Sequence, residues 1–282
     1  MKKILAILFV IAAASYQLAC NKTATPTQTG SPTIATNTGS VTSKTLLTGI
    51  NPWGINADSQ GNIYYTDRSL DTVMKFAPGS SATPVAVVSG LGSPFAVAVD
   101  ASGNIYAKNG NPRPGHITKF TNGVGSLFSS QRHCIGLTIA NGKVYYASTR
   151  SGDLYSQPVG GGAETTVAAG LGNPHEVAVD TGGNIYVADR TAGTIVKITS
   201  TGTRSTFATG FNHIWGLAVD PQGNVYASDR STGAVYMYNP AGQQTLLETY
   251  NTPHGLVYSK GSLYVADSGN GVIYQITFPQ WP

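Results

Sequence analysis

Short apolar runs alternate with polar turns through almost the whole chain after residue 44. Residues 215–238 show the pattern most clearly, because each run spans only three to five residues and each turn is rich in Asp, Gly, Asn or Ser. Runs of this length bounded by such turns predict β-strands joined by hairpins, and Gly223 can take the positive φ that a tight turn needs. The four predicted strands of this unit are 217–219, 225–228, 235–238 and 244–247.

The same unit recurs six times with a period close to 40 residues. Its six copies begin at Trp53, Phe95, Ile135, His175, Trp215 and His254. A period of this length built from four short strands is typical of a β-propeller, with one blade per repeat. The sequence therefore predicts an all-β fold, a six-bladed β-propeller with four-stranded blades.

The two ends of the repeat series indicate how the ring closes. The last copy stops after its third strand, 272–277, whereas the first copy is preceded by a lone strand, 44–49, similar to the fourth strand 244–247. We therefore predict that the N-terminal strand completes the sixth blade. Such closure removes the unpaired strand edges that favour aggregation.

The N-terminal region has the composition of an export signal and a tether. Lys2 and Lys3 precede an apolar stretch of 11 residues, which is too short for a mature membrane span, so residues 1–19 are predicted to be a signal peptide. Cys20 follows Leu18 and Ala19 in a pattern similar to the bacterial lipoprotein cleavage box. We expect Cys20 to carry a lipid anchor, the polar residues 20–43 to form a disordered tether, and residues 44–282 to form the propeller. The expected location is the bacterial cell envelope.

Charge and cysteine content exclude some classes of function. Without Lys2 and Lys3 the chain has 15 Lys and Arg against 13 Asp and Glu, and these residues do not cluster. This balance gives no indication of nucleic-acid binding. Cys134 is the one cysteine besides Cys20, so no disulfide can form within the propeller, and Cys134 is interpreted as a small buried side chain.

Three copies of the repeat carry a nearly complete motif, with Gly-Ile/Leu-Ala-Val-Asp followed by Gly-Asn-Val/Ile-Tyr and a second Asp, at residues 52–67, 174–189 and 215–229. This motif resembles the NHL repeat of six-bladed propellers, and the resemblance extends over about 230 residues. The wider group includes streptogramin lyase-like proteins, gluconolactonases and peptide-amidating lyases. Because propellers serve both as binding modules and as enzymes, the resemblance implies the fold and leaves the function open.

In this architecture, the first strand of each blade lines the central channel. The loop before it and the turn between the second and third strands then share one face, which we call the mouth. Alignment of the repeats places on the mouth two rings, the copy-initial residues named above and Asp67, Asn109, Ser148, Asp189, Asp229 and Asp267, together with His133, His213, Arg68, Arg150, Arg190 and Arg230.

Several mouth residues have a structural explanation. The ring aspartates recur with the repeat, so they are expected to accept backbone N–H hydrogen bonds at the turns and to pair with neighbouring arginines. The aromatic residues can pack or can form a ligand platform. The candidate ligand-binding residues at the mouth are Trp53, Phe95, His133, His213, Trp215, Arg150 and Arg190.

Glu176 departs from the repeat, because the other five copies have Gly or Ala at its position. A carboxylate beside a channel must be solvated, paired or bound to a cation. His175, Glu176 and His254 are therefore the candidate catalytic residues if the protein is an enzyme, with a streptogramin lyase-like reaction that uses a His base and a divalent metal such as Mg²⁺. A channel-facing Glu176 would favour that hypothesis, and an arginine partner would make the carboxylate structural.

Two resemblances point to a metal at the mouth, and both are incomplete. The amidating lyases hold zinc with Pro-His pairs, and here His175 and His254 follow prolines while Phe95 stands at the third position. His133 and His213 are possible substitutes, since zinc accepts three protein ligands and a water. The gluconolactonases use an acid near the first blade and an Asn before a Gly-Leu pair, which this chain lacks. No cofactor is therefore firm, and Zn, Mg or Ca stays possible.

The sequence favours an envelope-anchored binding or scaffold protein, whose mouth takes a small molecule, a glycan or a peptide or protein, with membrane contact through the lipid anchor alone. The alternative is a metal-assisted lyase or hydrolase that uses the same mouth.

Overall fold

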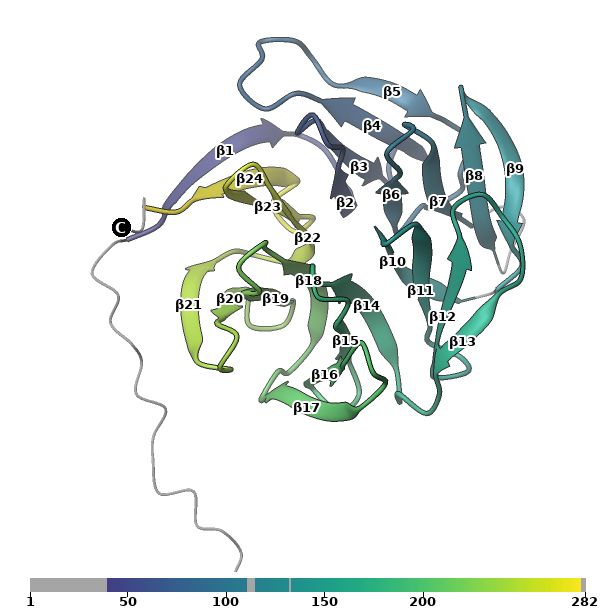
Figure 1. Cartoon of the computed structure of the whole chain (residues 1–282). Helices are drawn as coiled ribbons and strands as arrows, with labels where there is room; N and C mark the ends of the chain where they lie inside the picture. The colour runs from purple at the N-terminus through teal and green to yellow at the C-terminus, as the bar shows by residue number, and fades with distance from the viewer. Residues whose placement is uncertain (1–39, 111–114, 132, 280–282) are drawn as a thin grey trace, which may run out of the picture. The chain divides into compact units, whose positions relative to one another are not determined.

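The computed structural model describes residues 40–110, 115–131 and 133–279. These residues form six separate four-stranded antiparallel sheets arranged as blades around a central channel (Figure 1). No helix occurs among them, and hence none that could cross a bilayer. The predicted all-β, six-bladed architecture is confirmed.

Each blade contains four strands that follow one another from the channel to the rim. The first three blades consist of β2 (Pro52–Ala57), β3 (Ile63–Asp67), β4 (Thr72–Phe76) and β5 (Val85–Val88); β6 (Val97–Val99), β7 (Ile105–Asn109), β8 (His116–Thr121) and β9 (Val124–Ser129); and β10 (Cys134–Ala140), β11 (Lys143–Ser148), β12 (Asp153–Pro158) and β13 (Thr165–Ala168). The last three consist of β14 (Pro174–Val179), β15 (Ile185–Asp189), β16 (Thr194–Ile198) and β17 (Arg204–Thr209); β18 (Ile214–Val219), β19 (Val225–Asp229), β20 (Ala234–Tyr238) and β21 (Gln244–Thr249); and β22 (Pro253–Ser259), β23 (Ser262–Asp267) and β24 (Val272–Thr277) with β1 (Thr42–Thr48).

The sixth blade is closed by the N-terminal strand, as predicted. β1 pairs antiparallel with β24, from Thr42 opposite Thr277 to Thr48 opposite Val272, and the two strands lie side by side in Figure 1. β1 begins at Thr42, two residues before the predicted domain boundary at 44. The signal peptide 1–19 and Cys20 lie outside the described residues, as does nearly all of the tether.

The repeated Asp-x-x-Gly-Asn turn between the first and second strands is held by its own side chains. In blade 5 the carboxylate of Asp220 accepts hydrogen bonds from the backbone N–H of Asn224 at 2.8 Å and from the hydroxyl of Tyr226 at 2.9 Å. Gly223 has a φ of 85°, which a residue with a side chain adopts only with strain. The turn motif is therefore explained by backbone geometry, and its aspartate is occupied.

The cores lie between neighbouring blades rather than in one centre. One tyrosine from the second strand of five blades is fully buried there, namely Tyr65, Tyr106, Tyr146, Tyr186 and Tyr226. Cys134 packs in the same way, 2% exposed in a cluster with Leu137 and Tyr146, and burial raises the pKa of its thiol to about 12. Its expected role as a small buried side chain is confirmed.

The first strands approach one another closely around the channel. Each of β2, β10, β14, β18 and β22 has a bulge near its start, where the ladder register shifts. A Cβ at Gly216 would lie 2.1 Å from the carbonyl oxygen of His254 in the next blade, so only glycine fits there. Ser228 joins these two strands, because its Oγ accepts from Gly216 N–H and donates to the His254 carbonyl, both at 2.8 Å. This packing fixes the start of each first strand, and with it the mouth side chains.

Candidate functional site: the mouth and the channel

The copy-initial side chains meet in an aromatic cluster at the channel axis. The Trp53 ring stacks on His254 with centroids 3.9 Å apart, and it meets Phe95 edge-on at 5.3 Å and Trp215 edge-on at 5.5 Å. Trp215 also contacts His175, at 4.6 Å. We call these five residues the aromatic plug. They come from blades 1, 2, 4, 5 and 6, and the sequence alignment correctly placed them together.

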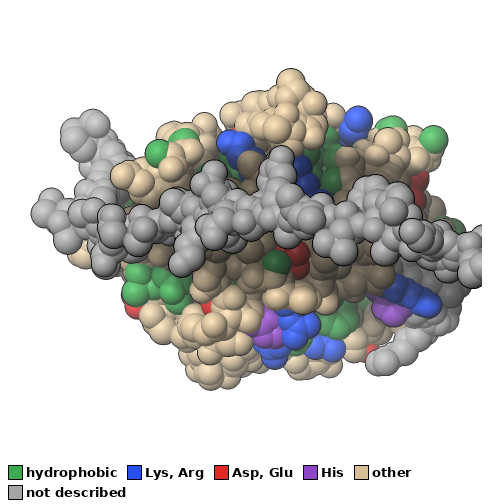
Figure 2. All heavy atoms as spheres, turned by 90° about the horizontal axis from the view of Figure 1, so that it is seen from below, with side chains coloured by type: hydrophobic (Ala, Val, Ile, Leu, Met, Phe, Trp, Pro, Cys, Tyr) green, Lys and Arg blue, Asp and Glu red, His purple; other side chains and the backbone are tan. Residues whose placement is uncertain are grey.

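Two arginines from the turns between second and third strands lie over this plug. The Arg68 guanidinium is 4.2 Å from the Trp53 ring centroid and 4.5 Å from that of Phe95. Arg230 lies 5.4 Å from the Trp215 ring centroid. Lys or Arg and His side chains also lie side by side on the lower side of the view in Figure 2. The mouth is therefore both aromatic and positively charged.

His175 and His254 are neutral and incompletely hydrogen-bonded. Burial, together with nearby positive charges, lowers the pKa of each to about 3; the charges are those of Arg190 and Arg230 for His175, and of Arg230 and Arg68 for His254. His254 Nδ1 bonds to the Ser268 hydroxyl at 2.8 Å, but its Nε2 is buried without a partner among the described residues. His175 Nδ1 and His213 Nε2 are in the same state. These nitrogens are therefore available to hydrogen-bond a ligand or a water at the mouth.

The ring aspartates have the structural role that was expected from their repetition. Asp229 is 2% exposed and accepts from the backbone N–H groups of Asn212 at 2.8 Å and Ser231 at 3.0 Å, and Asp67, Asp189 and Asp267 are held by equivalent bonds. For Asp189 and Asp229, the expected pairing with the arginine that follows is not found. Within the described part of the chain, no carboxylate lies within 4 Å of Arg190 or Arg230. Their positive charge is therefore available at the surface.

The blade-3 candidates lie apart from the plug. His133 is exposed with a φ of 63°, and its carbonyl oxygen accepts from the Thr149 hydroxyl at 3.0 Å. Arg150 is also exposed and lines a shallow hollow of about 400 Å³ with Gln131 and serines 130, 148 and 151. Arg150 extends the polar surface of the mouth, whereas the His133 ring contacts none of the plug residues.

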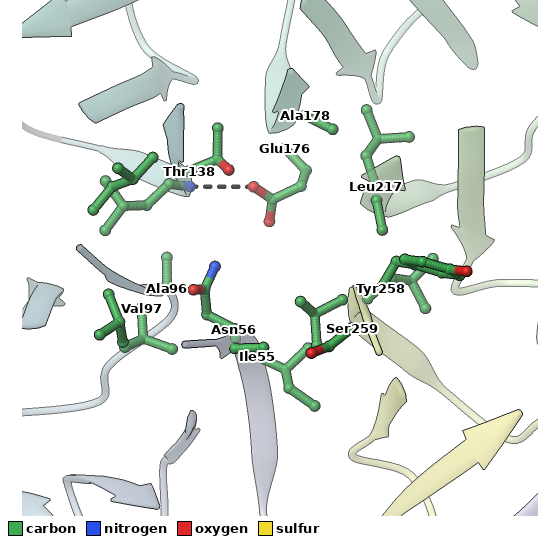
Figure 3. A pocket seen from close by; sticks show the side chains of 18 of the residues that line it. Ile55, Asn56, Ala96, Val97, Thr138, Glu176, Ala178, Leu217, Tyr258 and Ser259 are labelled. Carbon is green, nitrogen blue, oxygen red and sulfur yellow. Dashed lines mark hydrogen bonds between the residues drawn. The ribbon is translucent and has the colours of Figure 1, made fainter. Parts of the chain in front are cut away.

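Glu176 points away from the plug into the channel. Its carboxylate projects toward the channel centre, where the Asn56 amide approaches it from across the channel (Figure 3). Oε1 accepts from the backbone N–H groups of Leu137 and Val177, each at 3.1 Å. Glu176 therefore faces the channel and has no arginine partner among the described residues, which is the arrangement that the enzyme hypothesis requires.

The channel is hollowed on the side of the turns between first and second strands. The cavity has a volume of about 340 Å³, and first strands of all six blades line it. None of the five plug residues lines it. The mouth and the channel cavity are thus two separate sites, one with histidines and arginines and one with a carboxylate.

This separation divides the predicted catalytic set. His175 and His254 both contact Trp215, whereas Glu176 lies in the channel cavity. The described residues contain no group of three or more His, Cys, Asp or Glu side chains placed to hold one metal ion. The arrangement therefore provides a neutral histidine pair at the mouth, and Glu176 lines a different cavity.

Sequence reasoning missed the polar groups opposite Glu176. Asn56 and Thr138 line the cavity with it, and Tyr258 and Ser259 lie nearer the exit. Their position in the repeat could have identified them. Asn56 lies two residues after Gly54, and Thr138 two residues after Gly136, and both glycines mark the closest approach of neighbouring blades.

Comparison with known proteins agrees with this architecture. Residues 171–198 match the NHL repeat family. No curated protein sequence matches the chain at a significant level.

Solved structures with very different sequences share the fold. A streptogramin B lyase is 14% identical with a TM-score of 0.67, covering 85% of this chain and 97% of the other. A gluconolactonase from Xanthomonas campestris is 17% identical with a TM-score of 0.71, covering 85% and 90%. An auxiliary nutrient binding protein from Bacteroides thetaiotaomicron is 14% identical with a TM-score of 0.68, covering 83% and 70%. At these identities the likeness establishes the fold alone.

Proposed function

Since the chain is a six-bladed β-propeller with NHL repeats, we propose that it is a binding module that takes a carboxylate-bearing ligand at its mouth. The ligand would be a small molecule, or the acidic group of a glycan or peptide. The proposal agrees with the use of similar propellers for binding, of which the nutrient binding protein is one by its name.

One observation carries the proposal: Arg190 and Arg230 at the mouth have no carboxylate partner among the described residues, while the neighbouring ring aspartates are occupied. The ring aspartates are saturated by backbone N–H groups, and no described carboxylate reaches Arg190 or Arg230. Three buried imidazole nitrogens beside them have no hydrogen-bond partner in the described structure. Guanidinium groups bind carboxylates in bidentate fashion, and neutral imidazole can donate one further bond.

Tryptophan fluorescence can test the mouth directly. Trp53 and Trp215 are two of the three tryptophans in the chain, so a ligand at the mouth changes the emission. We expect triglutamate or trigalacturonate to bind, and the double variant Arg190→Gln/Arg230→Gln to bind it at least roughly tenfold more weakly, because each charged hydrogen bond contributes about 1.5–3 kcal/mol.

The control is Arg204→Gln, which removes the same charge from the rim strand β17, where Arg204 bonds to the carbonyl of Gly170 at 3.1 Å. This variant should bind as the wild type does. Equal affinity for triglutamine, or unchanged affinity in the double variant, would reject the mouth as a carboxylate site.

We further propose that the protein is exported and held at the cell envelope through a lipid on Cys20, with residues 20–43 as a tether. The support is the signal-like sequence and the polar composition of the segment that follows it. We expect the full-length chain to incorporate labelled palmitate and to sediment with membranes, and Cys20→Ser to do neither. A Cys20→Ser chain that still sediments with membranes would overturn the lipid anchor.

A further inference from the structure

The channel cavity is unlike the mouth, because its lining contains carboxylates and no cationic side chain. Its lining includes two acids, Asp58 at the exit and Glu176 in the interior. Asp58 is occupied by its own turn, with bonds from Asn62 at 2.7 and 2.9 Å, and by Lys75 at 3.6 Å. Glu176 is therefore the acid of this lining that can bind a ligand in the cavity.

Only one of the two carboxylate oxygens of Glu176 is hydrogen-bonded to the described residues, so the other is left for a ligand. Oε1 holds two backbone N–H groups at the bulges of β10 and β14, while Oε2 has no hydrogen bond to any described residue and faces the cavity. Gly136 makes this possible, because a Cβ there would lie 2.5 Å from the Glu176 Oε1. The carboxylate is thus held in one orientation by two blades.

The size and walls of the cavity indicate what could fill it. About 340 Å³ is within the range of small-molecule sites and an order of magnitude above the volume of one water, so a bare metal ion would leave most of it unfilled. Partly exposed aliphatic side chains line the cavity toward its exit, Ile139, Val179 and Val219 among them, between polar backbone groups of the first strands. The site therefore combines aliphatic contacts toward the exit with a carboxylate in the interior.

We propose that this cavity binds a primary alkylammonium, with its aliphatic stem along the channel wall and its ammonium group on Glu176 Oε2. Asn56 and Thr138 provide oxygens for the remaining N–H donors of the ammonium group. The ligand enters from the side of the turns between first and second strands, where Asp58, Asp100, Asp180, Asp220 and Lys260 are among the charged groups. This site is independent of the carboxylate site proposed at the mouth.

The pH dependence of binding follows from the state of Glu176. Burial raises the pKa of its carboxyl to about 8, although the N–H donors of Val177 and Leu137 act in the opposite direction, and no charged neighbour contributes. Binding an ammonium requires the ionised form. The apparent affinity should therefore rise roughly tenfold for each pH unit up to about pH 8 and level off above it.

Thermal shift with n-pentylamine tests the proposal on the full chain. At pH 8.5 we expect n-pentylamine to raise the Tm of the wild type, and 1-pentanol at equal concentration to raise it much less. Glu176→Gln keeps an oxygen for the two N–H groups and should lose the response to the amine. A far-ultraviolet circular dichroism spectrum identical to the wild type shows that this variant is folded.

Each alternative result has a defined meaning. Equal shifts with pentanol and pentylamine, or an undiminished amine response in Glu176→Gln, would overturn the proposal. A response to calcium chloride that Glu176→Gln abolishes, with no response to pentylamine, would overturn it in favour of a metal. Nα-acetyl-lysine amide separates two sources of the same chemistry: if it binds as pentylamine does, a lysine side chain of a peptide is an eligible ligand, and if only pentylamine binds, the ligand is a free amine. Both of these results support the site.

Discussion

Gly216→Ala is expected to destabilise the propeller by about 2–3 kcal/mol and to lower its Tm by roughly 4–12 °C. An alanine Cβ would lie 2.1 Å from the carbonyl oxygen of His254 and 3.0 Å from Ser228 Oγ. The first of these atoms belongs to the backbone of the next blade, which cannot move without opening the ring. The neighbouring chain would have to shift by more than an ångström, and the two hydrogen bonds through Ser228 would lengthen with it.

Gly160→Ala is the matched control for this prediction. Gly160 lies in the loop between β12 and β13, has no heavy atom within 4 Å of a built Cβ, and does not have a positive φ. The same chemical change there should be neutral or slightly stabilising, because alanine restricts the unfolded chain. Differential scanning calorimetry of both variants distinguishes the cause. Equal Tm values for the two would show that blade contact is not what selects glycine at 216.

The fold was predictable because the same sequence signals recur in successive repeats. One Asp-x-x-Gly-Asn turn is weak evidence, but the same turn at Asp58, Asp100, Asp180 and Asp220 leaves few architectures. The closure of the ring was equally predictable, since the lone strand before the first repeat matches the strand that is missing from the last repeat. Both features depend on backbone hydrogen bonding, which composition and spacing report directly.

The sequence predicted which residues lie at the mouth, but not how their side chains pack. Repeat alignment correctly grouped Trp53, Trp215, His175 and His254, because equivalent positions in a ring share one face. It could not show that the indoles pack on each other at the channel axis, since this depends on rotamers and on contacts between blades that are not adjacent in sequence.

Glu176 shows most clearly what the spacing of residues along the sequence cannot predict. His175 and Glu176 adjoin in the sequence and were therefore interpreted as one catalytic set, but His175 contacts Trp215 at the mouth whereas Glu176 lines the channel cavity. The ladder register shifts between Pro174 and Val177, and this bulge sends the two side chains to different sites. Bulges change the direction of side chains without an obvious sequence signal, because the bulge forms wherever the neighbouring strand allows it.

The second large effect is expected in the pH dependence of stability. Burial raises the pKa of Glu176 to about 8, against 4.5 for an ordinary glutamate, and so the folded protein binds this proton more tightly than the unfolded chain does. Where the folded state binds more protons, stability falls as pH rises. The contribution of Glu176 is therefore favourable below about pH 4.5, declines between about pH 4.5 and 8, and is lost above that range.

Urea unfolding of the wild type and Glu176→Gln at pH 5, 7 and 9, without added amine, measures this contribution. The difference in unfolding free energy between the two should shift in favour of Glu176→Gln by roughly 2–4 kcal/mol from pH 5 to pH 9, a range that allows for water in the channel. All other titrating groups are common to both proteins and cancel in the difference. Glu248→Gln, on the rim strand β21, makes the same chemical change and should follow the wild type. Parallel pH profiles for the wild type and Glu176→Gln would mean that channel water solvates the carboxylate fully, and Glu176 would then be an ordinary acid that requires no ligand.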